Sequence, residues 1–142
     1  MGARKRTAAN ERKEMMKVTS LARLSNCPTS PQKMRLVADM IRGKKVETAL
    51  NSLRFSTKEA AGRLEKVLLS AISNWQLKNE GQRIEDQDLF VKEVFIDSGR
   101  VLKRLRTAPQ GRGHRIKKRS NHITLVLDSK TPVATSSATE NN

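Results

Sequence analysis

Residues 98–127 contain nine lysines and arginines and no aspartate or glutamate. They supply +9 of the formal net charge of +15 that the 142-residue chain carries. An ordinary solvated face mixes charges of both signs, and like charges facing each other weaken strand pairing. This segment is therefore too charged to be buried and too one-sided to be an ordinary surface. It predicts contact with a polyanion, with nucleic acid as the first candidate and an anionic membrane surface as the second.

The remaining charge is distributed unevenly along the chain. Residues 1–17 hold six basic and two acidic residues, whereas residues 18–97 hold thirteen basic and ten acidic ones, as an ordinary domain would. We therefore predict a basic, flexible N-terminal arm at 1–16 and a single domain at 17–128 that includes a hairpin at 98–122. The Ser/Thr/Asn-rich residues 129–142 predict a disordered C-terminal tail.

Several functional classes are disfavoured by the sequence. No apolar run approaches the roughly 18 residues needed to span a bilayer, and the start of the chain lacks the apolar core of a signal peptide, so we expect no membrane association. The single cysteine, Cys27, cannot form an internal disulfide, which fits a cytoplasmic setting. Together with His114 and His122 it gives too few ligands for structural zinc. Without a nucleophile–base pair or a phosphate-loop motif, we expect no metal, no cofactor and no enzymatic activity.

Apolar residues recur at helical spacing in three segments of the body, after Pro31, at 46–53 and at 60–75. Ser30 before Pro31 is typical of a helix start, and Gly43 is typical of its end. We expect Ser56 and Glu59 to form a capping box at the start of the third helix. Trp75 lies on the apolar face of that helix and is predicted to be core. Residues 17–24 give a weak strand signal.

The second half of the chain predicts a small sheet with a long hairpin. Residues 89–96 and 123–127 are apolar and rich in β-branched side chains, so we expect them to pair with each other. Ser98 and Gly99 are expected to break the first strand. Two basic arms of about nine residues, each reaching roughly 30 Å, flank a proline- and glycine-containing turn at 107–113. The predicted fold class is α+β, with three helices packed on a small antiparallel sheet and a long protruding basic β-hairpin.

The candidate nucleic-acid contacts are cations of the hairpin and of the first predicted helix. Arginine outnumbers lysine six to three between residues 100 and 119, which suits bidentate contact with phosphate. His122 is expected to hydrogen-bond either RNA or the sheet. The complete predicted set is Lys33, Arg35, Arg42, Lys44, Lys45, Arg100, Lys103, Arg104, Arg106, Arg112, Arg115, Lys117, Lys118, Arg119 and His122.

The basic hairpin leaves two interpretations open. The chain could be a structural RNA-binding protein, or it could be an architectural DNA-binding protein, because basic β-ribbon arms with a proline at the tip enter minor grooves and kink duplexes. DNA-binding proteins of that kind are usually dimers. A single hairpin on a body that we predict to be monomeric favours RNA.

Residues 30–46, read as SPQKMRLVADMIRGKKV, closely resemble the family of large-subunit ribosomal protein twenty-two, of the bacterial type. Residues 66–74 resemble its third helix, and residues 111–124 resemble the return arm of its hairpin. The resemblance covers roughly 17–128. It implies a structural component of the large ribosomal subunit that binds large-subunit ribosomal RNA and supports assembly.

The same resemblance implies a monomer within the cytoplasmic ribosome, whose hairpin lines the nascent-peptide exit tunnel. The implied partners are the ribosomal RNA, neighbouring ribosomal proteins including large-subunit protein four, and the nascent polypeptide. The implied tunnel-lining tip comprises Thr107, Ala108, Pro109, Gln110, Gly111, Arg112 and Gly113.

Overall fold

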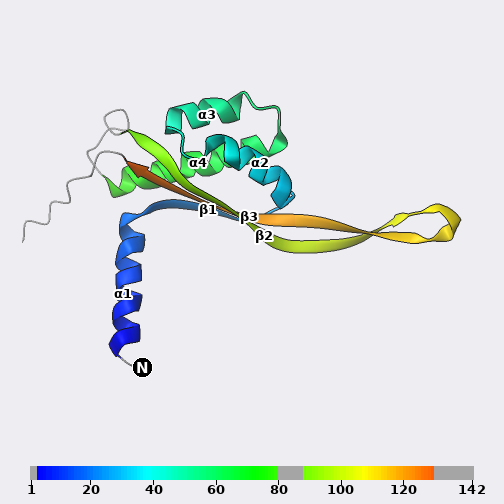
Figure 1. Cartoon of the computed structure of the whole chain (residues 1–142), viewed down its shortest axis with the longest axis horizontal. Helices are drawn as coiled ribbons and strands as arrows, with labels where there is room; N and C mark the ends of the chain where they lie inside the picture. The colour runs from blue at the N-terminus through cyan, green and yellow to red at the C-terminus, as the bar shows by residue number, and fades with distance from the viewer. Residues whose placement is uncertain (1–2, 80–87, 130–142) are drawn as a thin grey trace, which may run out of the picture.

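The computed structural model describes residues 3–79 and 88–129. Three helices form a layer over a sheet, and the distal parts of two strands leave the body as a long ribbon (Figure 1). This confirms the predicted α+β class. The predicted tail beyond Ser129 lies outside the described residues. The elements in chain order are α1 (Ala3–Val18), β1 (Ser20–Cys27), α2 (Pro31–Ile41), α3 (Val46–Arg54), α4 (Glu59–Lys78), β2 (Leu89–Thr107), a 3-10 turn (Pro109–Gly111) and β3 (Gly113–Ser129).

The sheet has three antiparallel strands in the order β1-β3-β2, so the last strand in the sequence is the central one. In its middle row, Leu125 of β3 lies between Ala22 of β1 and Val94 of β2, and all three are buried. This register confirms the predicted pairing of residues 89–96 with 123–127. The weakly signalled first strand exists but begins and ends three residues later than expected.

Helices α2, α3 and α4 cover one face of this sheet because each has an apolar stripe at helical spacing. The predicted faces are confirmed, and Leu64, Leu68 and Trp75 of α4 are all buried in one core. Gly43 ends α2 with a φ of +73°, a conformation that glycine adopts without strain. The expected capping box is wrong, because Lys58 is the N-cap of α4 and no side chain caps it.

The segment expected to be a flexible arm instead forms α1. Apolar periodicity is weak there, but residues 3–18 contain no glycine or proline and are rich in Ala, Arg, Lys and Glu, which favour helix intrinsically. In Figure 1 this helix runs away from the layer of α2, α3 and α4. Lys78 of α4 holds its C-terminal end, donating hydrogen bonds from Nζ to the carbonyl oxygens of Met16 (3.2 Å) and Thr19 (2.6 Å).

The expected break at Ser98 and Gly99 is wrong, since β2 continues through both residues. The pairing passes from Ser98 opposite Asn121 to Val101 opposite Arg119, which leaves two residues of β2 facing one of β3. Such a β-bulge bends and twists a strand without ending it. The ribbon and the body of the protein therefore share two continuous strands.

Candidate nucleic-acid interface

The ribbon beyond the bulge presents cations on both of its faces. Pairing runs without interruption from Val101 opposite Arg119 to Thr107 opposite Gly113. Directly paired residues share a face, and successive residues alternate between faces. The sequence predicted the cations, but only this register shows how they divide. One face carries Lys103, Arg115, Lys117 and Arg119, and the opposite face carries Arg104, Arg106 and Lys118.

No acidic side chain of the described residues neutralises these cations. None of the nine lysines and arginines between 100 and 119 forms an ion pair with a described residue. Of these nine cations, only Arg104 makes a side-chain hydrogen bond with a described residue. It donates this bond to the carbonyl oxygen of Lys103. Leu102 and Leu105 are 46% and 75% exposed, so the ribbon has no core of its own. A two-stranded ribbon is marginal in water, and this one lacks counter-charges on both faces.

The tip of the ribbon is a tight turn, as predicted. Pro109 opens it, and Gln110 and Gly111 both have positive φ, at 61° and 67°. The Ala108 N–H donates to the carbonyl oxygen of Arg112 at 2.9 Å, which closes the turn. Gly113, the other glycine of the turn, does not have positive φ. Arg112 is the only cation among residues 107–113.

The base of the ribbon is fixed to the end of β1 and to the loop that joins β1 to α2. Asn121 is fully buried and donates from Nδ2 to the carbonyl oxygen of Thr29 at 2.6 Å. His122, which was expected to bond either RNA or the sheet, accepts a hydrogen bond at Nδ1 from the Asn26 N–H at 3.0 Å. These contacts set the direction in which the ribbon leaves the body. Asn121 had no distinguishing sequence signal beyond its place between a basic run and an apolar strand.

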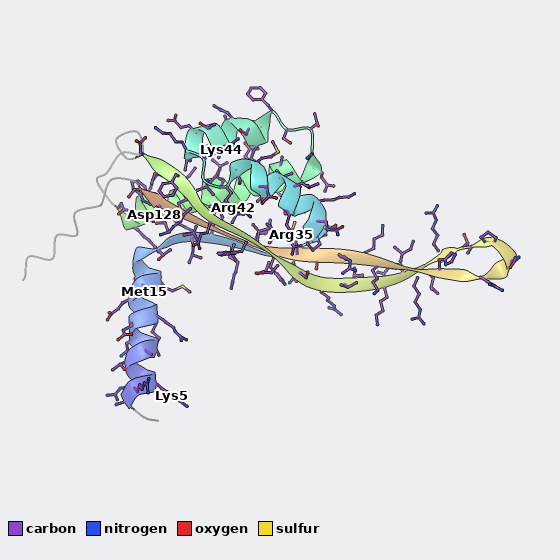
Figure 2. All side chains as sticks on the ribbon, viewed as in Figure 1. Lys5, Met15, Arg35, Arg42, Lys44 and Asp128 are labelled. Carbon is purple, nitrogen blue, oxygen red and sulfur yellow. The ribbon has the colours of Figure 1, made fainter. Side chains whose placement is uncertain are left out.

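The predicted contacts around α2 divide into two groups. Arg35 and Arg42 lie where the helical layer meets the sheet (Figure 2) and donate to the carbonyl oxygens of Ile96 and Val94, each at 3.1 Å. The carbonyl oxygens of Ile96 and Val94 in β2 thus bind part of the two guanidinium groups, which we had expected to contact RNA. Arg42 also forms an ion pair with Asp39.

The lysines of this region also differ in whether a protein group binds them. Lys45 donates from Nζ to the Asp88 carboxylate at 2.6 Å, and this hydrogen bond raises the pKa of Lys45 above its ordinary value. Lys33 and Lys44 make no hydrogen bond or ion pair through their side chains with any described residue. Backbone hydrogen bonds between residues 43–44 and Val91 hold the turn that carries Lys44 against β2.

Three cations outside the predicted set surround a hollow of about 310 Å³ between β1 and α4. Arg23 comes from the edge strand, and Arg63 and Lys66 come from one flank of α4. Arg63 donates to the Glu59 carboxylate at 2.9 Å, which holds the pKa of Arg63 above its ordinary value. The i, i+3 spacing of Arg63 and Lys66 was the only sequence signal that places them together.

The described residues were also searched for metal sites and for membrane-spanning helices. In residues 3–79 and 88–129, no group of three or more His, Cys, Asp and Glu side chains could hold a metal ion. Over the same ranges, no helix is both long enough and apolar enough to cross a membrane.

Comparison with known proteins gives a consistent result over most of the chain. Curated relatives, each called Large ribosomal subunit protein uL22, come from Christiangramia forsetii, Flavobacterium johnsoniae and Bacteroides fragilis. They are 63%, 64% and 61% identical to this chain over 127, 127 and 130 residues. The alignments cover 89%, 89% and 92% of this chain, and 94%, 93% and 95% of the relatives.

The family model described as Ribosomal protein L22p/L17e matches residues 22–128. This span includes the whole of α2, α3, α4 and the basic ribbon. The chain therefore belongs to the Ribosomal protein L22p/L17e family.

Proposed function

We propose that this protein binds large-subunit ribosomal RNA through its basic ribbon and places the tip of the ribbon in the wall of the nascent-peptide exit tunnel. Its family makes it a structural component of the large subunit of the cytoplasmic ribosome, and not an enzyme. The observation that carries the proposal is the ribbon with cations on both faces, none of which is paired with an acidic side chain of the described residues. A partner on one side only would leave half of these charges unpaired, whereas folded RNA that surrounds the ribbon supplies phosphates to both faces.

The body contributes a second group of contacts to the same RNA. Lys33 and Lys44 have no protein partner among the described residues, so their ammonium groups are available to phosphates. A guanidinium has five N–H donors. Arg35 and Arg42 would therefore contact RNA only through the N–H groups that do not bond to the carbonyl oxygens of β2. We therefore expect the ribbon to supply most of the affinity and the body to fix orientation.

The turn at residues 107–113 has a different role in this proposal. It carries one cation, Arg112, among small and neutral residues, so it contributes little to phosphate binding. It can instead offer a largely uncharged surface to a passing nascent polypeptide, near large-subunit protein four. Anchoring by the arms and contact with the nascent polypeptide at the tip are thus separable.

The test is a strain whose turn at 107–113 is shortened to two residues. We expect near-normal RNA affinity and large-subunit assembly, because roughly one phosphate contact is lost. Macrolide sensitivity or the stalling of particular nascent chains should change, as measured by drug-response curves and ribosome profiling. The matched control is Lys117→Ala/Lys118→Ala, which leaves the tip intact and should weaken RNA binding.

Two results would contradict the proposal in different ways. If the shortened strain fails to assemble large subunits, the tip is an anchor and the division of roles is wrong. If assembly, drug response and stalling are all normal, the tip does not reach the tunnel. A dimer in gel filtration at high salt would favour the alternative DNA-binding function.

A further inference from the structure

Helix α1 separates its charges onto two opposite faces. Lys5, Ala9, Arg12 and Met16 follow one another at helical spacing and share a face. Arg6 and Lys13 are seven residues apart, which is about two turns, and they flank that row. Lys17 follows Lys13 by four residues and therefore lies on the same side as Arg6 and Lys13. The opposite face holds Arg4, Glu11 and Glu14, which are one basic and two acidic residues. The positive charge of this helix therefore lies on one side.

Nothing in the described protein covers this basic face. Lys5, Arg6, Arg12 and Lys13 are all exposed, and none forms an ion pair or a side-chain hydrogen bond with a described residue. Figure 2 shows Lys5 at the end of α1 that is remote from the sheet. Most helical stability in proteins comes from packing against a partner, so a partner on this face would add to the stability of α1.

The chemistry of the two faces selects a phosphate backbone as that partner. A helix that lies on a membrane needs a broad apolar face, whereas Met15 and Met16 of α1 point to different sides and are the only large apolar residues between 3 and 17. Ala9 at the centre of the basic row lets a bulky polyanion approach the helix closely. Glu11 and Glu14 point away from it.

Lys78 gives this surface a fixed direction. Its Nζ bonds to the carbonyl oxygens of Met16 and Thr19 at the C-terminal end of α1, and the helix is about 24 Å long at 1.5 Å per residue. Helix α1 leaves the sheet at the end away from the ribbon (Figure 1). Residues 3–18 also lie outside the span that the family model matches.

We propose that α1 is a second RNA-binding element, which docks its Lys5–Arg6–Arg12–Lys13 face on a phosphate backbone of the ribosomal RNA. The inference rests on the proposed function, because the ribbon is expected to bind the same RNA. The helix adds a second point of attachment, so that the body is held on two sides.

The experiment compares two matched single variants of the full chain on protein-free large-subunit ribosomal RNA. Arg12→Ala removes one arginine from the basic face, and Arg4→Ala removes one arginine from the opposite face. The slope of log K against log salt should fall in magnitude by about 0.7 to 0.9 units in the first variant, which loses one phosphate contact. It should change by less than about half a unit in the second.

The ribbon variant Lys117→Ala/Lys118→Ala separates this inference from the proposed function. If that variant lowers the slope and both α1 variants match the parent, α1 does not bind RNA, whereas the role of the ribbon stands. If all three match the parent, the proposed function fails as well. Equal losses in the two α1 variants would mean unoriented attraction and overturn the docking face. If the basic-face variant binds RNA normally but dissociates from assembled subunits, the partner of α1 is a protein.

Discussion

Replacement of Gly99 by alanine tests the geometry at the base of the ribbon. A Cβ at this position would lie 2.7 Å from Ser120 Oγ and 3.2 Å from both the Ser120 carbonyl carbon and His122 Nε2. The φ of Gly99 is not positive, so its role is to permit this close approach. Ser120 can move its hydroxyl only by breaking the 2.6 Å hydrogen bond that it donates to the Arg100 carbonyl oxygen.

The expected cost follows from these contacts. Loss of the hydroxyl hydrogen bond costs about 1 kcal/mol, and the two remaining close contacts add about 1 kcal/mol of overpacking. The reduced entropy of the unfolded chain on replacing glycine returns roughly 0.4 to 1 kcal/mol. We therefore expect Gly99→Ala to lower the free energy of unfolding by about 1 to 1.6 kcal/mol.

A double-mutant cycle measured by urea denaturation checks the mechanism. Ser120→Ala alone should cost about 1 kcal/mol through the same lost bond. Because that bond can be lost only once, Gly99→Ala/Ser120→Ala should be about 1 kcal/mol less destabilising than the sum of the single variants. Additive effects, or a cost of Gly99→Ala below about 0.5 kcal/mol, would refute the proposed contact.

Three further predictions concern the body and the free ribbon. In a urea titration, Leu68→Ala should lower the free energy of unfolding by about 2 to 5 kcal/mol, because Leu68 is fully buried. The control is its exposed neighbour: Leu69→Ala should cost less than about 1 kcal/mol in the same titration. Asn121→Ala should cost about 1 to 3 kcal/mol in thermal unfolding, since it leaves the buried carbonyl of Thr29 without its donor, and an unchanged midpoint would show that water replaces the amide. Amide exchange of the RNA-free protein should show protection in 58–77 and little in 102–117, whereas strong protection at the tip would mean that the ribbon is stable alone.

The sequence was sufficient for the helical layer because burial there depends on a short local period. The face of α4 from Leu64 to Trp75 could be predicted because each apolar position recurs within one or two turns. The bulge at Gly99 could not be predicted, since a glycine after a serine has the same local signal whether a strand ends or bends. Helix α1 was missed because intrinsic propensity, rather than periodicity, favours it.

The candidate interface was predictable in its composition but not in its arrangement. A count of charges is enough to select the ribbon cations, but their division between two faces depends on the register with β3. Arg35 and Arg42 are equally basic in the sequence, and only the packing of α2 against β2 shows that carbonyl groups occupy part of each guanidinium.

The central position of β3 has a consequence for the order in which this protein can fold. Strands β1 and β2 each pair with β3, and β3 is the last of the three to leave the ribosome that makes it. Before residues 113–129 are synthesised, neither edge strand has its hydrogen-bonding partner, and the apolar sides of α2 and α4 have no complete sheet to cover. The closing contacts then join residues about a hundred positions apart, such as Ser20 and Leu127, which makes their formation slow. A nascent chain of this protein therefore stays open, with the outgoing arm of its ribbon already exposed, until nearly the whole sequence has been translated.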